Sequence, residues 1–251
     1  MDFFGLSVGI GASLGLLLVV RDAPPNRQLT WALAGLAVLA SALVGARLLY
    51  IGLHPVYYAG LPLTQTLRSL DGLSWPGGLA AALLAGGLTA LILHAPLAVT
   101  ADRLAPLFIS VSAMSWLGCA LTGCAYGNEL GEIYPWALPV VDMYGELTYR
   151  WPLQYVAAAS LLLAVAWVEG VTQGARQPGV RGCLNGLVLS LHSLLFSFWR
   201  ADPVPLYNGL RLDYAAGIGL GVLSILGLLG IALLRLGSSL KETRSGISDT
   251  H

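Results

Sequence analysis

Arg47 is the side chain of this sequence whose surroundings most demand a chemical explanation. It stands in "VGARLLYIG", with apolar residues for many positions before it and several after it. Even on a lenient scale, an arginine at the centre of a membrane helix costs about 2.5–3.5 kcal/mol. We therefore expect Arg47 to be paired, or to face a wet cavity or an anionic ligand. The alternative is that it extends to an interface, because His54 and Pro55 follow within two turns.

Two further arginines stand where apolar stretches meet polar ones. Arg150 opens "RWPLQY", with Gln154 one helical turn later, and Arg200 lies in "FWRADP", two residues before Asp202. A guanidinium binds phosphate or carboxylate through two parallel hydrogen bonds, so both arginines are candidates for holding an anion. Alternatives stay open: Gln154 can bond a neighbouring helix, and Arg200 can pair with Asp202 at little net energy.

Proton-transfer and metal-binding chemistry has few candidates in this chain. His192 lies within an apolar stretch and is a candidate buried acid or base, with a hydrogen-bonded structural histidine as the alternative. Cys119 and Cys124 lie in "SWLGCALTGCAYG", and their spacing does not match metal or redox motifs. We predict that they and Cys183 are free, structural cysteines that act as small apolar side chains. The sequence predicts no metal site and no cofactor.

The composition places these residues in a membrane protein. Of 251 residues, 56% are hydrophobic and 10% are charged, whereas soluble domains carry about 25% charged residues. The formal net charge is zero and no basic block is present, which argues against nucleic acid as a partner.

The apolar runs predict an all-α, polytopic fold with seven transmembrane helices. A hydrocarbon core of about 30 Å requires roughly 20 apolar residues per helix. Residues 1–237 form a single integral membrane domain in this interpretation, and residues 238–251 form a disordered cytoplasmic tail. The runs lie near 3–20, 29–53, 79–99, 104–123, 152–169, 182–199 and 213–236.

The distribution of basic residues predicts the orientation. With the N-terminus outside, the outer loops hold four arginines, namely Arg68, Arg150, Arg200 and Arg211. The inner side then holds Arg21, Arg27, Arg103, Arg176, Arg181, Arg235, Lys241 and Arg244. Because basic residues accumulate on the cytoplasmic side, we predict the N-terminus outside and the C-terminus in the cytoplasm. The long loops 54–78, 124–151 and 200–212 then lie outside, where we expect any chemistry.

Several segments together resemble one family, the prolipoprotein diacylglyceryl transferases of bacteria. The resemblance covers about residues 40–235, in order. "GARLLY" is similar to the family's Gly-Gly-Arg segment, and "LSWPGGL" to its Ser-Phe-His-Gly-Gly-Leu segment. "ADRLAPLFISVSAMSWLGCALTGCAYG" resembles its Ala-Asp stretch and the glycine-rich signature that follows. "RWPLQY" and "FWRADP" are similar to its Arg-His-Pro-x-Gln and Phe-Phe-Arg-x-Pro-Asp segments.

The resemblance implies transfer of diacylglycerol from phosphatidylglycerol to a cysteine thiol of a lipoprotein precursor peptide, outside the bacterial cytoplasmic (inner) membrane. The attacking cysteine belongs to the substrate, so Cys119 and Cys124 need not be nucleophiles. The phosphate-binding residues implied are Arg47, Arg150, Gln154 and Arg200. The residues implied to shape the headgroup site are Gly77, Gly78, Trp116, Gly118, Gly123 and Gly127.

The sequence departs from the family at five polar positions. Trp116 stands where the family has its signature arginine, and Pro76 where it has a histidine. Ala157 stands in place of a glutamate. Ser193 and Ser197 stand in place of an arginine and a glutamate, and His192 is a candidate substitute. The alternative hypothesis is therefore a catalytically inactive homologue that binds lipid or a membrane partner on the same scaffold.

Overall fold

The computed structural model describes residues 3–62, 64, 66, 72–132, 134–141, 144–172, 177–207 and 209–248, the segment 238–248 by its backbone only. Arg68, Arg176 and residues 249–251, which entered the predictions of orientation and tail, lie outside the described residues. Of Lys241 and Arg244 only the backbone is described.

Seven helices of the described chain are long and apolar enough to cross a membrane, which confirms the predicted fold class. They are α1 (Phe3–Arg21), α2 (Gln28–Leu53), α5 (Trp75–Ile92), α6 (Leu97–Thr122), α7 (Leu153–Thr172), α8 (Val180–Trp199) and α9 (Leu212–Ser248). The apolar part of α9 ends at Gly237. A 3-10 helix η1 (Pro25–Arg27) and a short helix α3 (Pro55–Tyr58) lie in the connections.

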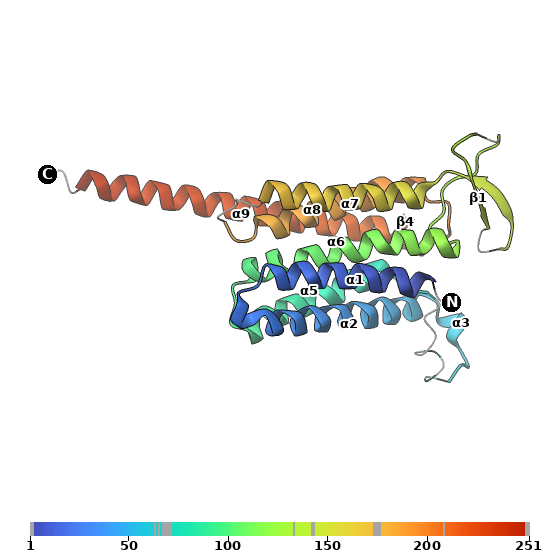
Figure 1. Cartoon of the computed structure of the whole chain (residues 1–251), viewed down its shortest axis with the longest axis horizontal. Coiled ribbons are helices and arrows are strands. Elements are labelled where there is room, and N and C mark those ends of the chain that lie inside the picture. The colour runs from blue at the N-terminus through green and yellow to red at the C-terminus, as the bar shows by residue number, and fades with distance from the viewer. Residues whose placement is uncertain are drawn as a thin grey trace.

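Helix α6 lies in the middle of the bundle (Figure 1). Helices α1, α2 and α5 pack on one side of it, and α7, α8 and α9 on the other. The N-terminus and α3 lie at one end, which we call the hairpin end because it also carries the strand β1. Helix α9 projects beyond the other end, which we call the tail end. The two termini therefore lie at opposite ends, as an odd number of spans requires.

Two spans have boundaries that differ from the prediction. The third span begins at Trp75 and ends at Ile92, rather than covering 79–99, and the fourth begins at Leu97 rather than at 104. Proline in the first turn of a helix supplies a suitable φ and lacks an N–H that would be unpaired there, so Pro76 favours the start of α5 at Trp75. Pro96 is the N-cap of α6 and lies just outside that helix. The stretch 100–103, expected to be an inner loop, is therefore helical.

The hairpin end contains strands that the apolar pattern does not predict. Strand β1 (Leu138–Val141) pairs antiparallel with β2 (Leu147–Arg150), and β3 (Leu206–Tyr207) pairs with β4 (Leu210–Arg211). Each second strand ends in an arginine close to the start of a helix: Arg150 precedes α7 by three residues, and Arg211 directly precedes α9. The two hairpins thus fix Arg150 and Arg211 at the hairpin end of the bundle.

Glycines allow the helices to approach closely. A Cβ on Gly11 or Gly15 of α1 would lie 2.7 Å from the backbone of α6. A Cβ on Gly77 of α5 would lie 2.4 Å from the carbonyl oxygen of Gly45 on α2. Helices in a membrane associate through close packing rather than through the hydrophobic effect, and small residues allow this packing. These contacts therefore set the spacing of the bundle.

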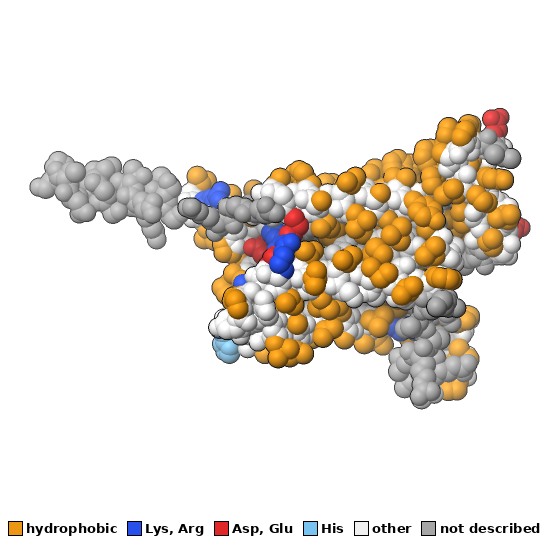
Figure 2. Space-filling model, viewed as in Figure 1, with side chains coloured by type: hydrophobic (Ala, Val, Ile, Leu, Met, Phe, Trp, Pro, Cys, Tyr) orange, Lys and Arg blue, Asp and Glu red, His pale blue; other side chains and the backbone are white. Residues whose placement is uncertain are grey.

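The outer surface of the bundle is apolar (Figure 2). Hydrophobic side chains cover most of the helical face in this view, and charged side chains gather towards the tail end. Exposed leucines such as Leu17, Leu84 and Leu163 belong to this surface. A lipid environment accounts for an apolar area too large for a water-facing monomer.

We predict that Gly77→Ala destabilises the fold by about 1–3 kcal/mol, because the added methyl group overpacks the α2–α5 contact. Gly87→Ala, in the same helix, is the control. A Cβ there meets nothing within 4 Å, so that variant should be neutral or slightly stabilising. Unfolding by SDS in mixed micelles measures both, and equal stability of the two variants would contradict the packing role of Gly77.

Candidate functional site

The segment Tyr126–Gly127 is the centre of the polar structure at the hairpin end. It follows α6, which ends at Gly123 with a left-handed φ of +75°. The carbonyl oxygen of Tyr126 accepts a hydrogen bond from the Ala201 N–H at 2.9 Å, and Gly127 forms a backbone bridge with Arg200. A Cβ on Gly127 would lie 2.9 Å from Trp151. Glycine is therefore required for the close approach of these chains.

Arg150 lies on one side of this segment. Its side chain is buried, and Nη1 donates to the carbonyl oxygen of Gly127 at 3.3 Å. Nη2 donates to Glu129 Oε1 at 2.8 Å, and the guanidinium lies 4.4 Å from the ring centre of Tyr126. Arg150 therefore contacts the Tyr126–Gly127 segment through a backbone carbonyl and an aromatic ring, and it also pairs with the exposed carboxylate of Glu129.

Gln154 holds the end of α6. Its side chain is 1% exposed, and Nε2 donates to the carbonyl oxygen of Cys124 at 3.1 Å. This contact joins α7 to the turn after α6, as the helix-bonding alternative anticipated.

The expectation that Cys119 and Cys124 are free is wrong, because they form a disulfide. The chain reverses at Gly123, and this turn brings the two Cα atoms to 4.5 Å, within the usual range for a disulfide. Cys183 is free, as predicted. The prediction was misled by the spacing, because in one continuous helix two cysteines five residues apart would lie too far from each other to form a disulfide.

Arg200 lies on the other side of Tyr126–Gly127, in a network of opposite charges. Its Nε and Nη2 donate to Asp202 at 2.8 and 2.5 Å, and Nη1 donates to Asp213 at 3.3 Å. Arg211 also contacts Asp213, at 3.3 Å, and lies 3.9 Å from Asp202. Burial lowers the pKa of the Arg200 guanidinium, but the hydrogen bond and charge of Asp202 and the charge of Asp213 outweigh it, so this pKa is raised. Two arginines and two carboxylates thus neutralise one another.

Aromatic side chains fill the space beside Arg200. The Arg200 guanidinium lies 5.7 Å from the ring centre of Trp116. His192 stacks on Phe196 at 4.3 Å between ring centres, and both rings lie 5.8 Å from Trp116. His192 Nε2 lies 3.1 Å from the carbonyl oxygen of Ala157. The structure therefore places His192 in a packed aromatic cluster, Trp116–His192–Phe196, bonded to backbone.

Four of the five positions at which the resemblance implies another residue lie in the aromatic cluster or beside Asp213. Ala157 is fully buried and packs with Phe196 in the cluster that includes Trp116. Ser193 Oγ donates to the carbonyl oxygen of Asp213 at 3.2 Å, and Ser197 Oγ donates to its carboxylate at 3.1 Å. The fifth position, Pro76, lies at the start of α5.

Arg47 lies in the other half of the bundle, on α2. It is 4% exposed, and it donates to the carbonyl oxygens of Thr66 and Gly72 at distances from 2.6 to 3.2 Å. Its guanidinium also lies 5.2 Å from the ring centre of Tyr58. Arg47 thus anchors the chain that follows α3, and it is buried in protein rather than extended to an interface.

The glycines predicted to shape the site divide between two roles. Gly123 and Gly127 belong to the Arg150–Arg200 region, and a Cβ on Gly123 would lie 2.6 Å from the Val141 carbonyl oxygen. Gly118 faces α1 instead, where its Cβ would lie 2.9 Å from Phe4. Gly77 and Gly78 pack against α2. Only the first pair lies in the polar cluster.

Asp213 and Arg211 are the main residues of this cluster that the sequence did not single out. Asp213 is 6% exposed and lies in the first turn of α9. The sequence position of Asp213 could have indicated its role. It follows "RL" and precedes a long apolar run, so it falls in the first turn of a helix, where the helix dipole favours a negative charge. Tyr126 gave no comparable signal, because aromatic residues are common at membrane interfaces.

We predict that Asp213→Asn destabilises the protein by about 3–5 kcal/mol, because two partly buried arginines lose a shared, buried carboxylate. The control is Glu129→Gln, which removes an exposed carboxylate and leaves Arg150 its contacts with the Gly127 carbonyl oxygen and the Tyr126 ring, so it should cost less than about 1 kcal/mol. SDS titration and thermal unfolding in micelles measure both variants. Similar stabilities would show that Asp202 alone compensates Arg200.

A second prediction concerns the disulfide. In unreduced, denatured protein a maleimide reagent should label Cys183 only, and after reduction it should label all three cysteines. Replacing Cys119 and Cys124 by serine should lower the free energy of unfolding by about 2 kcal/mol, the value expected for so short a loop. Labelling of three thiols before reduction would contradict the disulfide.

One comparison with known proteins matches nearly the whole chain. The family model described as prolipoprotein diacylglyceryl transferase matches residues 1–236, which include every residue of the Arg150–Arg200 region and all seven apolar helices nearly to the end of the last. A comparison with curated proteins finds no match. The family match covers almost the whole chain, and this multi-pass membrane protein therefore belongs to the prolipoprotein diacylglyceryl transferase family.

Proposed function

We propose that this protein transfers the diacylglyceryl group of phosphatidylglycerol to the lipobox cysteine thiol of a lipoprotein precursor, at the outer face of a bacterial cytoplasmic membrane. The observation that carries the proposal is the family match over residues 1–236. The Arg150–Arg200 region supports it, since it gathers phosphate-binding side chain types at one end of an apolar bundle.

The chemistry sets the demands on the site. A thiolate of the peptide attacks the glycerol carbon that carries the phosphate, a carbon–sulfur bond forms, and the carbon–oxygen bond breaks. Glycerol phosphate leaves with the electron pair, and the thiol proton passes to a base or to water. Only the thiolate is an effective nucleophile. Arginine suits the leaving phosphate, because its planar donors match two phosphate oxygens.

Arg150 is the arginine best placed for this role. Arg150 itself is buried, but its partner carboxylate, Glu129, is 59% exposed, so a phosphate that arrives from the membrane surface can take the place of Glu129. Arg200 is bound by one buried and one partly buried carboxylate, and Arg47 by backbone carbonyls. In this proposal they position the surrounding chain, and Gln154 holds the α6 turn next to the phosphate.

The orientation forms part of the proposal. The disulfide lies at the hairpin end, and disulfides persist in oxidising compartments outside the cytoplasm. The ion pairs of Arg21 and Arg181 lie at the opposite end, which agrees with an inner side rich in basic residues. Both observations support an outer hairpin end with the N-terminus outside.

A second candidate function rests on the aromatic cluster. In place of an arginine and two glutamates of the family, the structure has Trp116, Ala157 and Ser197 packed or hydrogen-bonded within the protein. Loss of a single transition-state donor costs about 10²–10³ in rate. This observation favours a protein that binds phospholipid or a membrane partner on the same scaffold without group transfer.

The deciding experiment uses the purified full chain in phosphatidylglycerol vesicles with a lipobox peptide. Transfer should appear as the mass of the diacylglyceryl peptide, and Arg150→Ala should reduce its rate by about 10²-fold or more. Glu129→Gln is the control and should retain the rate. Expression in a transferase-depleted bacterial strain should restore lipoprotein acylation. A folded wild-type protein that binds phosphatidylglycerol but gives no product would contradict the transferase proposal and support the second candidate.

A further inference from the structure

The tail end of the bundle carries a closed network of charges. Arg21 contacts Asp22 at 2.8 Å and Glu169 at 3.1 Å. Arg181 contacts Asp22 at 2.5 Å and donates to Glu169 through Nε at 2.8 Å. Burial raises the pKa of the Asp22 carboxyl, but hydrogen bonds and charges from Arg21 and Arg181 outweigh it and lower the pKa. Two arginines and two carboxylates therefore balance one another.

The carboxylate of Asp102 also has hydrogen-bond partners within the protein. Its carboxylate oxygens accept hydrogen bonds from the backbone N–H groups of Gly179 at 2.6 Å and Gly182 at 2.7 Å. These groups belong to the N-terminal turn of α8, whose unpaired N–H groups and positive dipole end favour an anion. Asp102 thus joins α6 to α8 and is not a counter-ion for its neighbour, Arg103.

Arg103 and Gln177 each have a buried polar atom, Nη1 and Oε1, that has no hydrogen-bond partner among the described residues. No described carboxylate pairs with the Arg103 guanidinium. It stacks on the buried ring of Trp31, 4.8 Å from the ring centre. Among the charges that act on it are Asp22, already shared by two other arginines, and the like-charged Arg27. A partly buried cation without an acceptor is costly, so an anion bound to Arg103 would stabilise the protein.

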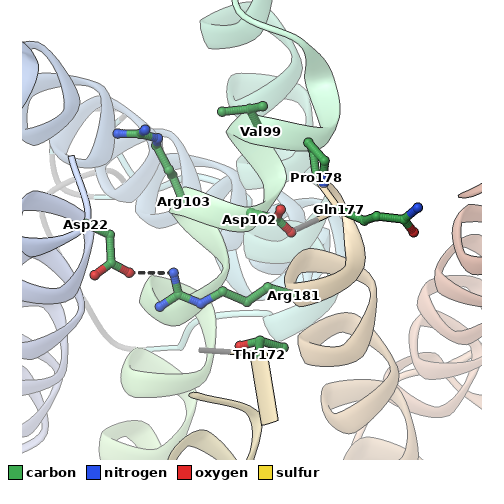
Figure 3. A pocket seen from close by; sticks show the side chains of 8 residues that line it. All are labelled: Asp22, Val99, Asp102, Arg103, Thr172, Gln177, Pro178 and Arg181. Carbon is green, nitrogen blue, oxygen red and sulfur yellow. Dashed lines mark hydrogen bonds and ion pairs between the residues drawn. The ribbon is translucent and has the colours of Figure 1, made fainter. Parts of the chain in front are cut away.

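A cavity of about 290 Å³ adjoins this arginine. Figure 3 shows Arg103 and Arg181 extending from different helices toward the side of Asp22, with Asp102 turned away from Arg103. The lining residues are Asp22, Val99, Asp102, Arg103, Thr172, Gln177, Pro178 and Arg181. This volume is at the small end of ligand pockets, so it suits a headgroup-sized anion and not an acyl chain.

The cavity lies beside the end of an apolar span. Arg103 lies in the second turn of α6, at the end of an apolar span. The polar headgroup layer begins where such a span ends. Arginine with an aromatic ring behind it is also better suited to a phosphate than lysine, because the planar guanidinium stacks and still presents its edge donors.

We propose that Arg103, supported by Trp31, binds a phosphate group in this cavity. The phosphate belongs either to a phospholipid of the leaflet at the tail end or to free phosphate. This site is separate from the Arg150–Arg200 region, which lies at the other end of the bundle, and it does not rest on the proposed transferase activity.

The first experiment counts bound lipid. Wild type, Arg103→Gln and the control Arg27→Gln are purified in neutral micelles with dioleoylphosphatidylglycerol, and native mass spectrometry measures retained lipid. Arg103→Gln should retain one lipid molecule fewer than the wild type, because the lost charge-assisted contact weakens lipid binding at this site by at least about tenfold. Arg27→Gln should match the wild type. Dioleoylphosphatidylcholine in place of the anionic lipid tests whether net negative charge is needed.

The second experiment uses sodium phosphate without lipid. A rise in the Tm of the wild type with phosphate, absent in Arg103→Gln, together with equal retention of phosphatidylglycerol, identifies free phosphate as the ligand. Loss of one lipid without a phosphate effect identifies the headgroup. Equal lipid retention and equal phosphate response in wild type and Arg103→Gln would overturn the proposal.

Val99→Glu keeps the proposal testable if Arg103→Gln does not fold. Val99 lines the cavity one helical turn before Arg103, and a glutamate four residues before an arginine forms a favourable helix pair. The variant should therefore be at least as stable as the wild type, yet lose the bound phosphate group, because its own carboxylate satisfies Arg103. Undiminished binding of phosphatidylglycerol and of phosphate by this variant would contradict the site.

Discussion

The carboxylate of Asp213 is the contact on which the hairpin end of this protein depends. It is buried in the first turn of α9, where the N–H of Tyr214 donates to it at 2.9 Å. Arg200 and Arg211 both contact it, and Ser197 donates to it from α8. The backbone of Arg200 then pairs with Gly127, whose carbonyl oxygen accepts from Arg150. One anion thus links two helices, a hairpin and the Tyr126–Gly127 segment.

This arrangement gives the two arginines of the site different tasks. Charges in a low-dielectric interior must be neutralised within the protein, and Asp202 and Asp213 do this for Arg200. Arg150 is itself buried, but its partner Glu129 is 59% exposed, so this ion pair reaches the surface through the carboxylate. In the proposed function, a phosphate takes the place of Glu129 on Arg150, while Arg200 keeps its own carboxylates and holds the geometry.

Hydropathy alone predicted the seven helices, because each span must be apolar over a bilayer thickness. It did not place the start of α5, which begins at Trp75 with Pro76 in its first turn, before the predicted apolar run. It also missed the disulfide, because the turn at Gly123 that brings Cys119 and Cys124 together cannot be read from their spacing. The pairing of Arg200 with Asp202 was available from the sequence, but its contact with Asp213 and the partners of Arg47 were not. Backbone carbonyls near Gly72, and an aspartate on another helix, come together only through the tertiary fold.

The residue at position 116 affects the net charge of the cluster around Arg200. With Arg200, Arg211, Asp202 and Asp213, the cluster already contains two positive and two negative charges. An arginine at position 116 would leave one positive charge in excess, and a phosphate would then be needed to balance it. Tryptophan instead presents a ring to Arg200 and packs on Phe196, so the cluster is neutral and packed without a ligand. At the opposite end of the bundle, Arg103 has no carboxylate partner among the described residues and stacks on Trp31; there, in our proposal, a phosphate group supplies the negative charge.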